Sequence, residues 1–173
     1  MADQPVRTRI LARGRWVPLQ EFMIRERGEG PVDGVELQGV EAARTPQPVL
    51  DAIAGARAVI IGPSNPVISI RTILEVPGTA DALRATDAPV VAVSPIVGGE
   101  VVKGPTEAFM AWASLPASAA GTAQAYEGLL DGMVTDEPFD GLTALRTDTR
   151  MDDAESRRRV AEDVLRFAES LSR

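Results

Sequence analysis

Cysteine and histidine are both absent from this sequence of 173 residues. Without cysteine the chain has no disulfide, no thiolate nucleophile and no zinc–sulfur site, a composition that fits a reducing cytoplasm. Without histidine it has no imidazole base for Ser-His-Asp or Cys-His catalysis and no imidazole ligand for a metal. Any bound metal is therefore expected to be a hard cation on oxygen ligands, which favours magnesium or manganese over zinc.

A basic surface and a long apolar run are missing as well. The formal net charge of −7 argues against nucleic acid, because binding it requires a basic face that displaces counterions. No segment approaches the ~18 uncharged apolar residues of a membrane helix, and the opening residues do not resemble a secretory signal. We therefore expect a soluble cytoplasmic protein that binds no nucleic acid and no membrane. A small anionic ligand is compatible with this charge if arginine or lysine lies at the site.

Predicted strands and helices alternate along the chain, which indicates an α/β domain with a mostly parallel sheet. The apolar patterns predict strands at 8–11, 35–38, 58–61, 89–93, 129–135 and 142–146. They predict helices at 18–27, 46–54, 67–74, 79–84, 105–113, 117–130 and 152–171. Thr45 is the expected N-cap of the second helix. We interpret residues 1–173 as a single α/β region.

One strand-to-loop junction, at 58–70, is the sharpest functional signal. An apolar run with the branching of a buried strand is followed by a glycine and two prolines, which end strand pairing. Ligands of open parallel sheets lie beyond the carboxyl ends of the strands, where Ser64, Asn65 and Ser69 would meet a substrate. The helix start that follows would add free N–H groups for an anion. An ordinary surface turn is the alternative, because turns use the same residue types.

A second junction of the same kind follows the strand at 89–93. Ser94 opens its loop, and Gly98 and Gly99 allow a backbone to approach a ligand closely. Lys103, the only lysine of the chain, stands between this glycine pair and a helix start. That position favours a phosphate contact, although the spacing of a P-loop is absent. A surface lysine placed there by chance is the alternative.

Two arginine groups have less specific patterns. Arg25 and Arg27 lie near the end of the helix predicted at 18–27, where paired guanidinium groups could clamp a phosphate. A solvated helix face is the commoner arrangement of such charges. The three arginines at 157–159 are expected to face solvent on the last helix.

Three motifs in order, at 20–39, 62–74 and 94–105, resemble those of the 2-phospho-L-lactate transferase family of coenzyme F-420 biosynthesis. A related family of regulators that bind nucleotide-sugars has a similar core. The run Ser64-Asn65-Pro66 favours the transferase over the regulators.

The resemblance implies a Rossmann-like fold and a phosphoryl-group transfer. A 2-phospho-L-lactyl group, or enolpyruvyl phosphate, activated by GMP would pass to the deazaflavin Fo with release of GMP. A magnesium ion would neutralise the phosphates. Arg25 and Arg27 are further candidates for anionic groups, and no residue is assigned a catalytic role. By this resemblance the candidates for donor binding are Ser64, Asn65, Pro66, Ser69, Ser94, Gly98, Gly99 and Lys103.

The matched motifs correspond to roughly the second half of the family's length. The family's opening strand, its glycine-rich loop and the aspartate expected to hold metal and deazaflavin have no counterpart before Thr8. The sequence therefore suggests a fragment, a miscalled start or one half of a split enzyme. We expect the main magnesium ligand in the missing half, an exposed sheet edge, and either a homodimer or association with an N-terminal half. A catalytically incomplete nucleotide-binding or regulatory module is the alternative.

Overall fold

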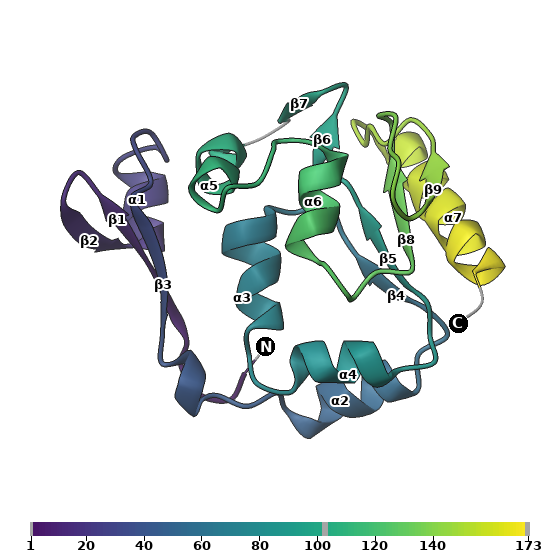
Figure 1. Ribbon diagram of the computed structural model, residues 1–173, viewed down its shortest axis with the longest axis horizontal. Helices are drawn as coiled ribbons and strands as arrows, with labels where there is room; N and C mark the ends of the chain where they lie inside the picture. Colours follow the sequence, from purple (N-terminus) through teal and green to yellow (C-terminus); the bar gives the residue numbers. More distant parts are fainter. Residues whose placement is uncertain (1, 102–103, 172–173) are drawn as a thin grey trace.

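The computed structural model describes residues 2–101 and 104–171. The largest sheet in this part of the chain has four parallel strands in the order β4-β5-β8-β9 (Figure 1). Two of them, β5 and β8, are buried along their whole length, as expected for strands covered on both faces. The predicted α/β fold is thereby confirmed. The four strands are β4 (Val59–Ile61), β5 (Val90–Val93), β8 (Gly132–Thr135) and β9 (Thr143–Arg146).

Successive side chains of a strand point to opposite faces, so the apolar strands β5 and β8 need cover on both. Helices lie on both faces of the parallel sheet. On one face, Val91 shares a buried cluster with Val164 of α7 (Ala154–Ser170). On the other, Ala92 shares a second cluster with Leu83 of α4 (Thr79–Ala85). That second face also carries α2 (Gln47–Ala54) and α6 (Ala119–Ala125).

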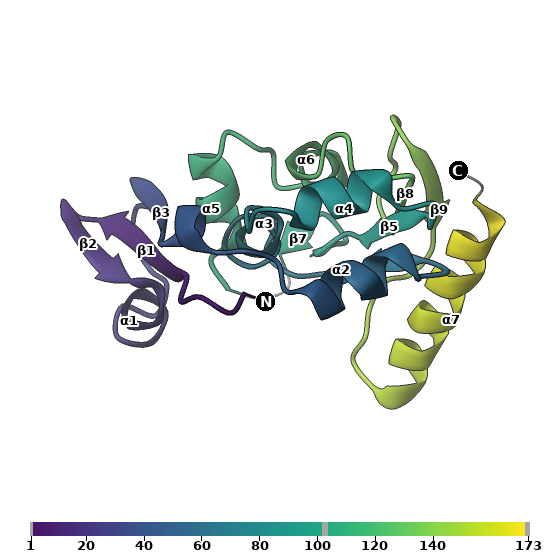
Figure 2. The ribbon, with the colours of Figure 1, turned by 90° about the horizontal axis from the view of Figure 1, so that it is seen from below.

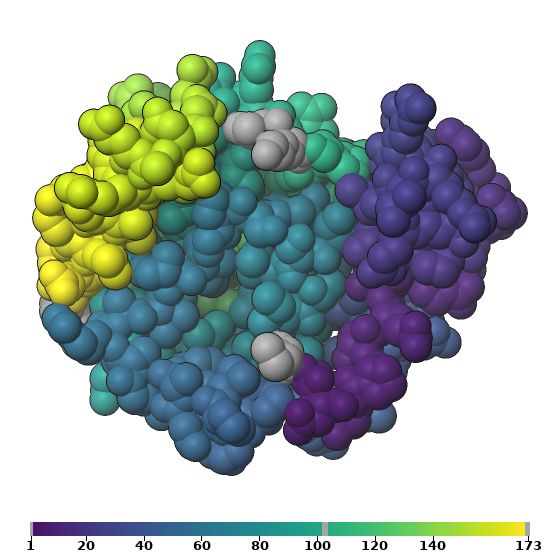
Figure 3. All heavy atoms as spheres, turned by 180° about the vertical axis from the view of Figure 1, so that it is seen from behind, coloured from purple at the N-terminus to yellow at the C-terminus, as the bar shows by residue number. Residues whose placement is uncertain are grey.

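The N-terminal residues form a separate antiparallel sheet in the order β2-β1-β3. Figure 2 shows this sheet with α1 at one end of the molecule and α7 at the other, and Figure 3 shows the same separation from behind. Phe22 of α1 meets Phe109 of α5 edge to face, with ring centroids 5.9 Å apart. The elements are β1 (Arg7–Ala12), β2 (Arg15–Pro18), α1 (Leu19–Ile24), β3 (Gly34–Gln38) and α5 (Thr106–Trp112).

Strand β2 differs from the prediction of a helix beginning at Pro18. Arg13 and Gly14 both have positive φ, 50° and 73°, which is the backbone of a two-residue type I′ hairpin turn. This turn folds β2 back onto β1, so α1 begins only at Leu19 and ends at Ile24.

A second unpredicted hairpin joins β6 (Ile96–Val97) to β7 (Glu100–Val101). Its two turn residues, Gly98 and Gly99, again have positive φ, 64° and 77°. The strands are too short to show a period of two in the sequence.

Thr45 does not cap α2, because Pro46 occupies the N-cap position and no side chain caps that helix. Its hydroxyl instead lies 2.7 Å from that of Thr79 and 3.0 Å from the carbonyl oxygen of Pro77. Thr45 therefore joins the start of α2 to the start of α4.

Further differences concern helix lengths and types. The helix predicted at 67–74 begins as a π-helix, Pro66–Ile70, and continues as α3 (Arg71–Leu74). The helix predicted at 117–130 is shorter, because Ser118 caps α6 and the helix ends at Ala125. A short 3₁₀ helix, Val40–Ala42, follows β3. None of the described helices combines the length and apolar character needed to cross a bilayer.

Candidate functional site

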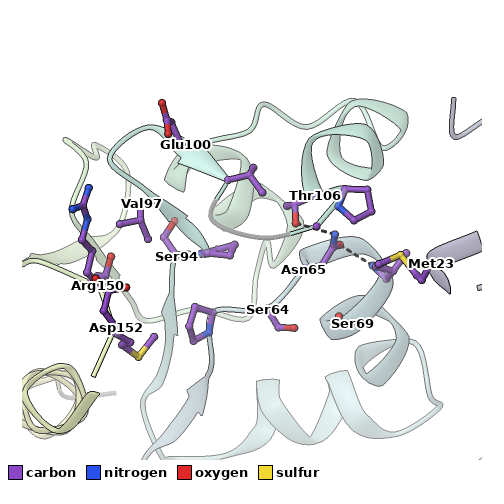
Figure 4. Close-up of a pocket in the computed structure, with 18 residues that line it drawn as sticks. Met23, Ser64, Asn65, Ser69, Ser94, Val97, Glu100, Thr106, Arg150 and Asp152 are labelled. Atoms are coloured by element: carbon purple, nitrogen blue, oxygen red, sulfur yellow. Dashed lines mark hydrogen bonds between the residues drawn. The ribbon is translucent and has the colours of Figure 1, made fainter. Parts of the chain in front are cut away.

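A cavity of about 770 Å³ lies beyond the carboxyl ends of β4 and β5 (Figure 4). Its walls come from the loop after β4, the π-helix, the loop and hairpin after β5, the start of α5 and the loop after β9. Parallel strands bring their carboxyl ends to one edge, which explains why segments far apart in the sequence meet here. The volume is in the range of small-molecule sites, roughly 300–1,000 Å³.

Ser64 and Ser69 present the available hydroxyl groups on the β4 side of the cavity. Both side chains line it, and neither hydroxyl has a hydrogen bond within the described part of the chain. Figure 4 shows both on the same side, below Ser94 and Thr106. A hydroxyl can donate to a phosphate oxygen or accept from a ligand. The two predicted serines are therefore positioned to contact a ligand.

Asn65 lines the cavity but uses its carboxamide within the protein. Its Oδ1 accepts hydrogen bonds from the backbone N–H groups of Val67 and Ile68, at 2.9 and 3.0 Å. Its Nδ2 donates to Oγ1 of Thr106 at 3.2 Å, a bond drawn in Figure 4. The expectation of free N–H groups at this helix start is therefore wrong, because Asn65 occupies them. Asn65 instead joins the π-helix to the start of α5.

Ser94 lines the cavity from a buried position with no exposed surface. Its Oγ accepts a hydrogen bond from the backbone N–H of Ile96 at 3.2 Å, which orients the chain from β5 into the hairpin. At the hairpin turn, the backbone N–H of Gly98 donates to Oδ2 of Asp136 at 2.7 Å. Gly98 and Gly99 do not line the cavity; they shape the hairpin beside it.

The remaining predicted residues lie elsewhere. Arg25 pairs with Glu21 across 3.5 Å on the exposed surface of α1, and neither it nor Arg27 lines the cavity. Pro66 is buried as the first residue of the π-helix. Lys103 lies outside the described residues.

The loop between β9 and α7 adds cavity residues that the sequence reasoning missed. Thr149, Arg150 and Asp152 line the cavity, and Figure 4 shows Arg150 and Asp152 on the side opposite Asn65 and Thr106. The sequence could have predicted them, because this loop follows the carboxyl end of the strand predicted at 142–146, just as the loops at 62–70 and 94–105 follow predicted strands. The charged residues that follow Thr149 and Arg150, at 152–159, are typical of a solvent-facing helix start.

The described residues do not fit a complete magnesium site. Glu100 and Asp152 are the carboxylates that line the cavity. Within the described ranges there is no group of three or more Asp, Glu, His or Cys side chains able to hold a metal. We therefore derive no chemical step through a metal from these residues.

A parallel sheet with a cavity beyond its strand ends defines a Rossmann-like ligand-binding fold. The chain belongs to the family described as 2-phospho-L-lactate transferase CofD, whose model matches residues 1–169. The resemblance carried by the three motifs is thus confirmed.

Curated relatives agree with this family. The chain is 38% identical to the 2-phospho-L-lactate transferase of Methanosarcina barkeri, an alignment that covers 95% of the chain and 56% of the relative. It is 40% identical to that of Halobacterium salinarum, with coverage of 95% and 50%. It is 34% identical to the phosphoenolpyruvate transferase of Streptomyces coelicolor, with coverage of 99% and 58%. The chain thus spans about half the length of the curated relatives it matches.

A solved structure supports the fold. A crystal structure of a Bacillus halodurans protein matches with a TM-score of 0.63 at 17% identity, covering 95% of this chain and 60% of that one. At this identity the match shows a shared fold.

Proposed function

We propose that this chain holds the nucleotide of a GMP-activated donor in transfer of a 2-phospho-L-lactyl or enolpyruvyl phosphate group to the deazaflavin Fo. In this reaction a ribityl hydroxyl of Fo attacks the phosphorus of the transferred group. The bond between that phosphorus and the bridging oxygen breaks, GMP leaves with the electron pair, and the hydroxyl proton is released to solvent. Since the chain spans about half the length of its relatives, the whole reaction is proposed together with the remaining part of such a transferase.

The observation that carries this proposal is the cavity at the carboxyl ends of β4 and β5 in a member of this family. The hydroxyls of Ser64 and Ser69 have no hydrogen-bond partner among the described residues, so they are available to phosphate oxygens. The Asn65–Thr106 hydrogen bond joins the start of the π-helix to the start of α5 beside these serines. Positioning of the phosphates, rather than covalent chemistry, is the main task of a protein in phosphoryl transfer.

Calorimetric titration with GDP tests the nucleotide site. We expect GDP to bind, and Ser69→Ala to weaken binding by about 3- to 10-fold, the loss of one hydrogen bond to a phosphate oxygen. Ser170→Ala is the matched control, because its hydroxyl bonds the Phe167 carbonyl oxygen at the far end of α7. Equal losses in both variants, or no GDP binding by the wild-type chain, would contradict the proposal.

The transfer itself is tested by GMP release. The chain is incubated with magnesium, the GMP-activated donor and Fo, with and without a polypeptide that supplies the remaining length of a family member. We expect GMP release and a phosphorylated Fo product only in the complete mixture. GDP binding without turnover in that mixture would favour the regulatory alternative.

A further inference from the structure

The β9–α7 loop, residues 147–153, contains polar groups at the cavity that have no partner and no role in the function proposed above. Thr149 is 2% exposed and lines the cavity, yet its Oγ1 has no hydrogen-bond partner among the described residues. Buried polar atoms are almost always satisfied in folded proteins, because an unpaired one is costly. An unpaired hydroxyl at a cavity wall therefore points to a ligand as its partner.

Arg150, the next residue, is the cation of this wall. Within the described ranges it is the only positively charged side chain that lines the cavity. Most arginines of the chain hold a carboxylate or carbonyl oxygen, but no such bond involves the Arg150 guanidinium in the described structure. Its Nη2 lies beside the hairpin turn, 3.9 Å from where a β-carbon on Gly98 would stand. The side chain is exposed at the edge of the cavity and has no ion pair among the described residues.

Two neighbours fix the backbone of this loop. A carboxylate oxygen of Asp148 accepts a hydrogen bond from the Arg150 N–H at 3.0 Å. Arg159 of α7 reaches back to the carbonyl oxygens of Asp148 at 2.6 Å and Arg150 at 3.5 Å. Arg159, expected to face solvent, is still 37% exposed but also bonds this loop. Thr149 and Arg150 are presented by a loop tied to a long helix, so little ordering is needed when a ligand binds.

Of the acidic groups near Arg150, Asp148 and Asp136 have other partners, whereas Asp152 and Glu100 also line the cavity. Asp148 pairs with Arg159 at 3.3 Å, and Oδ2 of Asp136 accepts the Gly98 N–H. Oδ1 of Asp136 is buried and unpartnered in the described structure, and Asp136 and Arg150 share a second, open hollow beside the cavity. An ion pair between Arg150 and Asp136 is therefore the competing role for the arginine, and the experiment must separate the two.

We propose that Arg150 and Thr149 form an anion subsite for a phosphoryl or diphosphate group. A guanidinium matches phosphate oxygens with two parallel hydrogen bonds, and a hydroxyl adds a third donor. The ligand would bridge this wall and the Ser64 and Ser69 hydroxyls across the cavity. That the ligand is a guanine nucleotide rests on the proposed function, whereas the anion subsite itself does not.

The test compares binding of inorganic pyrophosphate, GDP and guanosine to the wild-type chain and three variants by calorimetry. We expect Arg150→Gln to weaken pyrophosphate and GDP about 10- to 100-fold, as expected for a lost charge-assisted hydrogen bond, and to leave guanosine unchanged. Thr149→Val should weaken the same two ligands about 3- to 10-fold without lowering the melting temperature, since the hydroxyl has no internal partner. Arg158→Gln, which breaks only the exposed pair with Glu162, is the matched control and should change nothing.

The outcomes distinguish the subsite from the proposed function. Unchanged pyrophosphate and GDP binding by Arg150→Gln, with a lowered melting temperature, would overturn the subsite in favour of the Asp136 pair. Unchanged binding with an unchanged melting temperature would overturn it as well. Arg150-dependent pyrophosphate binding without any GDP binding would uphold the subsite and contradict the nucleotide function. GDP binding that does not depend on Arg150 would support the nucleotide function and overturn the subsite.

Discussion

Asn65 belongs to the motif that resembles the transferases, yet its contacts are architectural. Both ends of its carboxamide are used inside the protein, where they hold the π-helix and the start of α5 together. The neighbouring hydroxyls of Ser64 and Ser69 line the same wall and have no hydrogen bond among the described residues. A motif residue can thus owe its identity to positioning the wall that other residues use for contact.

Replacing Asn65 tests this role. Asn65→Ala should lower the free energy of unfolding by about 1–3 kcal/mol, because it removes the acceptor for two backbone N–H groups and the donor to Thr106. Asn65→Asp is the matched variant, since it keeps the acceptor and loses only the donor, and its loss should be smaller. Urea unfolding measures both. Equal stability of Asn65→Ala and wild type would contradict the assignment.

Residue types at the site were predictable only in part. Ser64, Ser69 and Ser94 were found because they follow predicted strands. Which of them has a free hydroxyl depends on local hydrogen bonds that no spacing rule reveals. Glycines illustrate the same limit, since Gly98 and Gly99 have positive φ whereas Gly62 does not. Arg150 was missed because a single arginine before a charged helix looks like surface.

Among the elements, α7 is the best defined by its sequence. Asp153 caps it, with Oδ1 accepting the Ser156 N–H at 2.7 Å and the Ser156 hydroxyl accepting the Asp153 N–H at 3.1 Å. The Ser156 backbone hydrogen bond is the main reason that the pKa of Asp153 lies below its ordinary value. The helix ties down the loop that presents Arg150, so its cap matters to the cavity.

The capping carboxylate predicts a pH-dependent stability. Because the folded pKa is lowered, the contribution of Asp153 is fully present above the unfolded pKa, about 3.9, and is lost as the pH falls through the folded value. Asp153→Ala should lower the melting temperature by about 2–4 °C at pH 7, and the difference from wild type should shrink below pH of about 4. Asp153→Asn keeps an uncharged acceptor and should lose less. A difference that stays constant across this pH range would refute the charge contribution.

At the scale of the whole molecule, an apolar cluster packs the antiparallel sheet against the π-helix, α5 and β6. Ile10 and Phe22 of the N-terminal part share it with Phe109 and Met110 of α5 and with Val67 of the π-helix. The cavity walls at 64–69 and 104–106 therefore rest on the antiparallel sheet as well as on the parallel one. This contact makes the N-terminal residues part of the structural support of the site.

Truncating Phe109 in this apolar cluster tests whether the cluster couples the unfolding of the two sheets. Phe109→Ala should lower the free energy of unfolding by about 3–5 kcal/mol, because Phe109 has no exposed surface and leaves a cavity. Hydrogen exchange of β1 amides should accelerate with it if the two sheets unfold together. Leu165→Ala, at a side chain 52% exposed on α7, is the control and should stay within about 0.5 kcal/mol of wild type. Unchanged exchange in β1 would show that the sheets unfold independently.

The parallel sheet was predictable because its central strands are continuous apolar runs, such as 90–93. The antiparallel sheet was not predictable, because the turn between β1 and β2 depends on the left-handed backbone of Arg13 as well as Gly14. Arginine carries no turn signal in a sequence. The contact between Phe22 and Phe109 was equally unpredictable from sequence, because more than eighty residues of chain separate the two.

The cavity draws its walls from residues near 64, near 100 and near 150. During synthesis the first wall leaves the ribosome long before the last, and the C-terminal helix that fixes the last wall emerges later still. A nascent chain therefore has no complete pocket until the residues near 150 and helix α7 have emerged. A ligand that contacts all three walls would stabilise only molecules in which all three have folded.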